Sequence, residues 1–218
     1  PPQPYHLNRI LITNNYFKGV SMAAGNLTPL GEIAEIFMGA TVSYYSKLPL
    51  EGEDRLLLIS GNSLDEHGNI VESRLIPVWK HKHNTTRFIA QTGDVLVLAR
   101  GNIRATVFAE ALHAEPLLTS ANFAIIRPHQ PEVSHAYLAE LINTPSSRER
   151  LGLSLGKGTP SIRAADLRRL KVPIPDPQTR KAIAEIRDAR NEAFRATQAL
   201  AEQQYATATS MIEGLLWS

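Results

Sequence analysis

Short runs of apolar residues, each closed by residues that favour turns, recur along the middle of the chain. Residues 56–59 end at a Ser-Gly-Asn turn, residues 94–99 end at an Arg-Gly-Asn turn, and residues 123–126 end at an Arg-Pro pair. Such short, branched runs with turn residues between them are typical of buried strands. Residues 134–143 instead have apolar side chains three and four positions apart and predict a short amphipathic helix. We therefore predict an α+β domain with a strongly bent sheet over residues 27–175.

The chain changes character on both sides of this domain. Residues 1–26, with three prolines in the first four positions, are interpreted as an irregular lead-in. In residues 172–177 alternate positions are proline, which removes hydrogen-bond donors and favours extended backbone, so no helix is expected there. Beyond Pro177 no proline or glycine occurs until Gly214. Residues 176–218 therefore predict one long helix of roughly 38 residues, or about 55 Å.

The long helix carries a stripe of residues at spacings of three and four, which is typical of helices that pair in coiled coils. The positions of this expected partner face are Ile183, Ile186, Ala193, Thr197, Leu200, Gln204, Met211 and Leu215. Small or polar residues in its middle predict a weak, closely packed coil. The helix either folds back on its own domain or pairs with another helix. Its length and the proline-rich break before it favour pairing.

Bulk composition narrows the class of protein only in part. A chain of 218 residues, 43% hydrophobic and 20% charged, is ordinary for a protein with one substantial core. No apolar run reaches the roughly 18 residues of a membrane span, and the N-terminus lacks the layout of a secretory signal, so we expect a cytoplasmic protein without membrane contact. The absence of cysteine excludes disulfides and thiolate metal sites. A net charge of +2 does not by itself indicate nucleic-acid binding, so local clusters of charge have to decide.

The loop at residues 79–87 is rich in cations and in side chains that donate hydrogen bonds. Its candidates for contact with DNA are Lys80, Lys82, His83, Asn84 and Arg87. Cations suit phosphate groups, and directed donors suit the edges of bases. A solvated turn is the alternative interpretation. The two histidines of the loop have no convincing third ligand beside them, so we expect no metal site.

Three further segments offer candidate DNA contacts. They are Arg100, Asn102 and Arg104; Lys157 and Thr159; and Tyr44, Tyr45 and Lys47. In the first segment a glycine lets the backbone approach DNA closely, and a hairpin with surface arginines is the alternative. The second is a glycine-rich loop that either contacts the DNA backbone or turns the chain. The third combines aromatic and basic groups, with simple packing of the tyrosines as the alternative. A last basic group is interpreted mostly as solvated helix faces: Arg148, Arg150, Arg163, Arg168 and Arg169.

Motifs of catalysis are absent from the sequence. Residues 152–158 superficially suggest a phosphate-binding loop, but they have one residue too few between the glycines. Gly158 also stands where a serine or threonine would bind magnesium. The nucleophile elbow of hydrolases, the zinc-protease helix and the two signatures of DNA methyltransferases do not occur. We expect no intrinsic catalysis and no cofactor.

Three segments, in order, resemble one family. Residues 30–41, LGEIAEIFMGAT, are similar to the opening of the target recognition domain of Type I restriction-modification specificity subunits. Residues 93–97, GDVLV, resemble a strand of that domain. Residues 158–183, which include VPIP, resemble the exit of the domain into the family's conserved helix. The chain departs from the family at Thr179 and Arg180, where a Glu-Gln pair is usual, so local contacts at the helix start are expected to differ.

The resemblance implies a non-catalytic subunit that recognises DNA. In the family each recognition domain reads one half of a split site in double-stranded DNA, and the helices set the distance between the halves. DNA adenine methyltransferase subunits dock on the helices, and a restriction subunit can join them. With one domain and one helix, this chain is expected to be a half-size form that dimerises through its C-terminal helix and reads a split palindrome. A stand-alone DNA-binding or coiled-coil adaptor protein without a methyltransferase is the alternative, and a truncated two-domain subunit would give the same sequence pattern.

Overall fold

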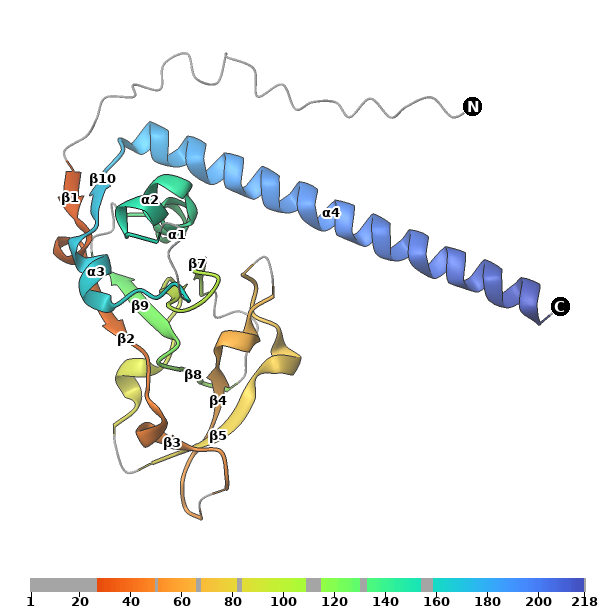
Figure 1. Cartoon of the computed structure of the whole chain (residues 1–218), viewed down its shortest axis with the longest axis horizontal. Helices are drawn as coiled ribbons and strands as arrows, with labels where there is room; N and C mark the ends of the chain where they lie inside the picture. The colour runs from red at the N-terminus through yellow and green to blue at the C-terminus, as the bar shows by residue number, and fades with distance from the viewer. Residues whose placement is uncertain are drawn as a thin grey trace. The chain divides into compact units, whose positions relative to one another are not determined.

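The computed structural model resolves the chain into two units (Figure 1). The described residues are 27–49, 51–65, 68–81, 84–108, 115–129, 133–153 and 159–217. One unit, here the sheet unit, spans Ala23–Pro175; the other, the helix unit, contains Asp176–Ser218. The lead-in predicted for residues 1–26 lies outside the described residues.

The strands of the sheet unit form two four-stranded sheets and one two-stranded ribbon. The first sheet has the order β2-β9-β6-β7 and is antiparallel throughout. The second has the order β3-β5-β4-β8, in which β4 and β8 are parallel. The ribbon pairs β1 with β10. The strand bounds are β1 Leu27–Pro29, β2 Ala34–Met38, β3 Tyr45–Ser46, β4 Arg55–Ile59, β5 Ile76–Lys80, β6 Val95–Leu98, β7 Arg104–Val107, β8 Leu117–Thr119, β9 Phe123–Pro128 and β10 Lys171–Pro173.

The uninterrupted apolar runs of the sequence are the central strands. All four residues of β6 and the first four of β9 are buried, because both faces of these strands are covered. Their register places Leu96 opposite Ile125. The strands predicted at residues 56–59, 94–99 and 123–126 are confirmed as β4, β6 and β9, although Asp94 and Ala99 lie outside β6.

Short helices cover the sheet unit and bring its ends together. Their bounds are α1 His135–Asn143, α2 Pro145–Arg150 and α3 Ala164–Arg169, with 3-10 turns η1 Leu30–Glu32, η2 Val42–Tyr44, η3 Gly61–Ser63, η4 Glu72–Arg74 and η5 Thr86–Phe88. The predicted helix at 134–143 is confirmed as α1, which begins at the N-cap Ser134 and packs on β6 and β7. The α3 helix packs against η1 and β2. Sheets with separate helices make this the predicted α+β fold.

Two apolar clusters form the core of the sheet unit. The first contains Phe37, Ile59, Leu64, Ala90, Leu96, Leu98, Phe108, Leu117, Phe123 and Ile125. The second contains Ala40, Tyr45, Leu56, Leu58, Val78 and Leu118. Half-buried Phe88 packs against both clusters. The segment that carries Phe88 is therefore held in place by the core, although Thr86 and Arg87 directly before it are exposed.

A buried ion pair ties the two central strands of the first sheet to this segment. Asp94, whose side chain is 1% exposed, accepts two hydrogen bonds of 2.8 Å from the guanidinium of Arg127 on β9. Its carboxylate also accepts the backbone N–H of Gln91 at 2.9 Å, and Arg127 donates to the carbonyl of Ile89 at 3.3 Å. The Asp94 carboxylate stabilises the guanidinium charge and raises the pKa of Arg127. This network fixes the backbone that follows η5.

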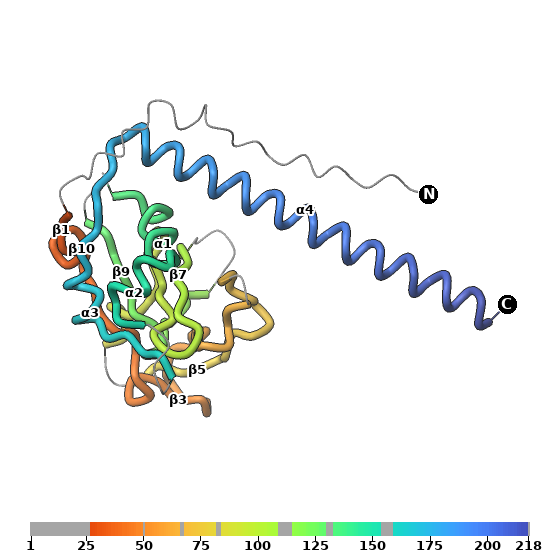
Figure 2. The backbone as a smooth tube through the Cα atoms, turned by 45° about the horizontal axis from the view of Figure 1, so that its top comes forward, coloured from red at the N-terminus to blue at the C-terminus, as the bar shows by residue number. Residues whose placement is uncertain are grey.

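The helix unit contains a single uninterrupted helix, α4, Pro177–Leu216, which Figure 2 shows as one continuous tube. The Asp176 carboxylate caps it by accepting the backbone N–H groups of Gln178 and Thr179 at 2.9 and 3.0 Å. The Thr179 hydroxyl also donates to this carboxylate. That bond, more than the two backbone bonds, holds the pKa of Asp176 below its ordinary value. Pro177 belongs both to the proline run expected to be non-helical and to the helix predicted over residues 176–218; it lies in the first turn of α4, where a missing N–H costs nothing.

Candidate nucleic-acid interface

Five candidate residues lie around the β3–β5 pair and the turn after it, and we call them the edge group. They are Tyr44, Lys47, Lys80, Asn84 and Arg87. Strand pairing sets Lys80 opposite Tyr45, and the N–H of His81 donates to the Tyr44 carbonyl at 3.0 Å, so the end of β5 lies beside η2. The Tyr44 ring packs edge-on against Phe88, with 4.9 Å between centroids. The sheet and the core therefore bring together side chains that are up to 43 positions apart in the edge group.

Arg87 is the anchored cation of the edge group. Its guanidinium pairs with the Glu35 carboxylate at 2.6 Å and lies 4.3 Å from the centroid of the Phe37 ring. The guanidinium of Arg127 lies 5.4 Å from the same ring. The Arg87 side chain remains 55% exposed, so its position is fixed by Glu35 and Phe37 while a face stays open to solvent.

The remaining candidates of these segments have different environments. Tyr45 is 7% exposed and belongs to the second core cluster, which is the packing role that the sequence left open for the tyrosine pair. Burial raises its pKa. Lys82 and His83 lie outside the described residues. Asn84 is exposed, and its amide oxygen accepts the N–H of Thr86 at 2.9 Å, so this side chain also shapes the turn that carries Arg87.

A second group, here the hairpin group, consists of Arg100, Asn102 and Thr159. In the β6–β7 hairpin loop Ala99 and Ile103 are buried, and Arg100 and Asn102 lie between them on either side of Gly101. Both polar side chains are exposed. The turn between them needs the positive φ of +76° that Gly101 adopts.

The segment around Thr159 lies against the hairpin loop. The N–H of Gly101 donates to the Pro160 carbonyl at 2.9 Å, and the N–H of Ile162 donates to the Ala99 carbonyl at 2.9 Å. Arg100 and Ser161 form an antiparallel bridge. The backbone thus holds Thr159 next to Arg100 and Asn102 across almost 60 residues of sequence. Lys157, predicted in the same loop, lies outside the described residues.

Arg104 is less exposed than Arg100 and Asn102. It begins β7, is half-buried, and donates to the carbonyl of Leu64 at 3.4 Å, a carbonyl that also accepts from Arg74 at 3.4 Å. Its Nε is buried without a partner in the described part of the chain. The side chain therefore contributes to the packing of the β4–β5 connection more than to an exposed surface.

Two of the arginines that we interpreted as solvated helix faces also make structural contacts. Arg148 donates to the carbonyl of Ile103 at 3.0 Å, which ties α2 to the hairpin loop. Arg168 donates to the carbonyl of Ile36 and so ties α3 to β2. Both side chains are exposed, as that interpretation expects, and a carbonyl acceptor also fixes each guanidinium. Nothing in the sequence indicates these contacts, because the acceptors lie 45 and 132 positions away.

The face predicted on α4 is exposed from Ile186 onward. Ile183 is half-buried, Ile186 is 37% exposed, and exposure rises to 55% at Leu200 and 68% at Met211. The other predicted positions are also exposed: Ala193, Thr197, Gln204 and Leu215. Four large side chains beside this stripe were missed, namely Phe194, Tyr205, Ile212 and Leu216. Their own spacing of 11, 7 and 4 residues is helical and was the signal that would have found them.

Two classes of site do not occur in the part of the chain that the structure describes. Over those residues, no group of three or more histidine, aspartate or glutamate side chains is placed to hold a metal ion. Over the same residues, no helix is both long enough and apolar enough to cross a membrane.

The fold is similar to solved structures of one kind of protein. A chain from a structure of the assembly and conformational transition of the type I R-M system matches with a TM-score of 0.57 and 19% identity, over 83% of this chain and 42% of that one. The HsdS subunit from Thermoanaerobacter tengcongensis matches with a TM-score of 0.55 and 18% identity, over 87% of this chain and 48% of its own. A Type-I restriction-modification system S subunit from M. genitalium gives a TM-score of 0.46 and 15% identity, over 76% and 38%.

This chain spans less than half the length of each of these structures. No family model matches the sequence. No curated protein matches it either. The resemblance to specificity subunits inferred from three sequence segments is thus confirmed at the level of the fold.

Proposed function

We propose that the chain is a DNA-recognition subunit of a Type I restriction-modification system, with no catalytic activity of its own. The observation that carries this proposal is the fold likeness to a type I R-M chain and to an HsdS subunit, which extends over 83% and 87% of this chain. Both shares exceed the part of the chain that the sheet unit Ala23–Pro175 makes up, so the likeness extends beyond that unit and supports more than a shared sheet alone.

The sheet unit reads one half of a split site in this proposal. The hairpin group supplies the base contacts, because Arg100 and Asn102 point outward from a rigid, backbone-bonded loop. Arginine makes paired hydrogen bonds to guanine and asparagine makes them to adenine in the major groove. The edge group supplies cations for phosphates, with Arg87 held in place by Glu35 and Phe37.

The helix unit is the surface for protein partners in this proposal. The exposed apolar side chains of α4 need a partner, because a stripe of this length is unfavourable in water. We assign it to pairing with a second copy of the chain and to docking of a DNA adenine methyltransferase, with a restriction subunit as a further partner. Two copies related by a two-fold axis would read a split palindrome.

The test is size-exclusion chromatography with light scattering on the chain mixed with its candidate methyltransferase subunit and a pool of random duplexes. A complex with two copies of each protein that enriches a split palindrome is the expected result. A chain that captures neither the methyltransferase nor any duplex would refute the proposal. A chain that enriches a duplex without capturing the methyltransferase would favour the stand-alone DNA-binding adaptor.

A further inference from the structure

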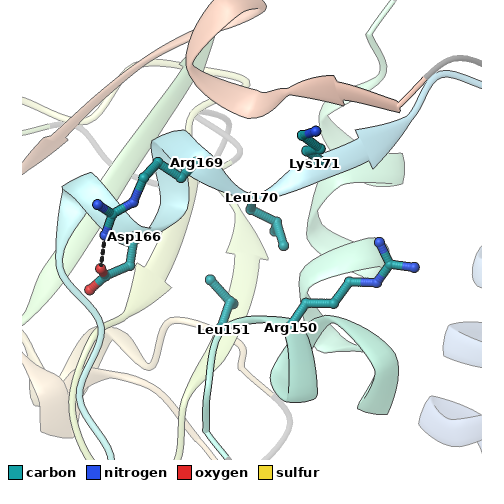
Figure 3. A pocket seen from close by; sticks show the side chains of 6 residues that line it. All are labelled: Arg150, Leu151, Asp166, Arg169, Leu170 and Lys171. Carbon is teal, nitrogen blue, oxygen red and sulfur yellow. Dashed lines mark hydrogen bonds and ion pairs between the residues drawn. The ribbon is translucent and has the colours of Figure 1, made fainter.

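A basic pocket lies between α2, α3 and β10, and none of its lining residues belongs to the groups that we predicted to contact DNA. It has a volume of about 290 Å³ and is lined by Arg150, Leu151, Asp166, Arg169, Leu170 and Lys171 (Figure 3). The two leucines lie at its centre and the charged side chains surround them. Three cations and one carboxylate leave the lining with a net charge of +2. An apolar floor with a cationic rim suits a phosphate joined to a sugar better than a free inorganic ion.

Two of the pocket's cations are available to a ligand. Arg150 and Lys171 are exposed, and neither side chain has an ion-pair or hydrogen-bond partner within the described residues. Arg150 ends α2 and Lys171 begins β10, so two different elements bring them to one pocket. Neither charge is needed to hold the fold together.

The single carboxylate of the pocket is already neutralised. Asp166 accepts hydrogen bonds from Arg163 at 3.0 and 3.2 Å and from Arg169 at 2.8 Å. The bond from the Arg163 side chain is the main reason that the pKa of Asp166 falls to about 2. The carboxylate therefore stays ionised at neutral pH and fixes two arginines beside the pocket instead of repelling an anion.

The pocket continues the hairpin group rather than standing apart from it. Ile162 is 4% exposed, so the flanking Ser161 and Arg163 in this extended segment point to the opposite side, toward solvent. Arg100 is the bridge partner of Ser161, and paired residues in an antiparallel ladder point to the same side. Arg100 and Arg163 therefore lie on one face, and Asp166 links Arg163 to the pocket. We call the row Arg100, Arg163, Arg169, Arg150 and Lys171 the basic track.

We propose that the basic track follows the DNA backbone outward from the hairpin group, and that the pocket of Arg150 and Lys171 takes a phosphodiester group flanking the recognised half-site. This inference rests on the proposed DNA-binding function and assigns a new contact within it. DNA presents a phosphate every 3.4 Å of axis along each strand, so a continuous row of cations matches it. Contacts of this kind position the protein and carry no sequence information.

The test compares two double variants of the full chain, in the complex and on the duplex obtained above. The pocket variant is Arg150→Gln with Lys171→Gln, and the control is Lys181→Gln with Arg195→Gln, which removes the same charge from α4. For the pocket variant we expect affinity to fall roughly tenfold at low salt, equally on the selected duplex and on a scrambled one. The slope of log Kd against log salt should fall by about 1, since the pocket takes one phosphate and each phosphate contact contributes about 0.9.

The outcomes separate this inference from the proposed function. If the wild-type chain binds no duplex, both are refuted. If it binds and the pocket variant keeps the salt slope of the control, only the pocket assignment is refuted. A pocket variant that binds DNA normally but no longer captures the methyltransferase would also overturn it, and would assign the pocket to a protein contact. Circular dichroism that matches the wild type excludes loss of the fold.

Discussion

Replacing Asp94 by alanine should destabilise the sheet unit by about 3 kcal/mol or more, although the residue lies outside every strand. The change leaves the Arg127 guanidinium without its carboxylate, and it leaves the N–H of Gln91 without its acceptor. Removing one partner of a buried ion pair typically costs about 3–5 kcal/mol. Arg127 keeps 22% of its side chain exposed, so water offsets part of the loss and the lower end applies.

The measurement is equilibrium unfolding in guanidinium chloride, followed by circular dichroism, together with thermal melting. For a domain of this size each kcal/mol lowers Tm by about 2–4 °C, so a loss of 3 kcal/mol lowers it by about 6–12 °C. Arg127→Ala should destabilise the sheet unit at least as much, because it leaves the Asp94 carboxylate, which is only 1% exposed, without a partner. The double variant should cost clearly less than the sum of the two, because the single changes remove the same interaction.

The control is Arg55→Ala, which breaks an exposed pair with Glu115 at 2.5 Å. Both side chains of that pair are 40% exposed or more, so the expected cost stays below about 1 kcal/mol. An Asp94→Ala variant that unfolds within 1 kcal/mol of the wild type would refute the reasoning. Additive effects of Asp94→Ala and Arg127→Ala would refute it as well.

Three further outcomes are expected. In the folded chain Asp166 should titrate near pH 2 by carboxyl-carbon NMR, so its stabilising effect is full above pH 3.8 and is lost as the pH falls through about 2; Arg163→Ala should return the midpoint toward 3.8, and an unchanged midpoint would contradict the assigned cause. Light scattering should give a mass near twice 24.1 kDa, and Leu200→Glu with Met211→Glu should give the monomer, whereas a wild-type monomer at micromolar concentration would rule out pairing through α4. Arg100→Ala should cost about 1–3 kcal/mol on the selected duplex and relax preference at one base pair in a substitution series, and equal losses on all duplexes would argue against a base contact.

The elements of this fold were largely predictable because local patterns determine them. The apolar runs at β4, β6 and β9 and the helical spacing at α1 and α4 do not depend on distant residues. The division of the strands into two sheets depends on pairing between strands far apart, such as the parallel pair of β4 and β8, and no local signal specifies it. The sequence pattern therefore predicts the pieces better than their arrangement.

The environments of individual candidate residues also were predictable only where a local pattern determines them. The exposure of Arg100 and Asn102 was predictable because a loop after a strand exposes its polar side chains. The difference between Tyr44 and Tyr45 was not predictable, since it depends on which of the two begins β3 and faces the core. Nor did the sequence indicate that Arg150 and Lys171 meet at a pocket, because they come from a helix and a strand with a loop and another helix between them.

The ribbon of β1 and β10 has a consequence for how such a protein diversifies. Leu27 lies opposite Pro173, so the first and last described strands of the sheet unit are hydrogen-bonded neighbours. A unit whose two ends meet can be exchanged as one continuous cassette, because whatever lies between the ends returns the chain to the same place. Under the proposed function, recombination at both ends of the cassette would replace the hairpin and edge groups while the helix that follows keeps its sequence. New specificity would then arise by exchange of a whole module as readily as by point mutation.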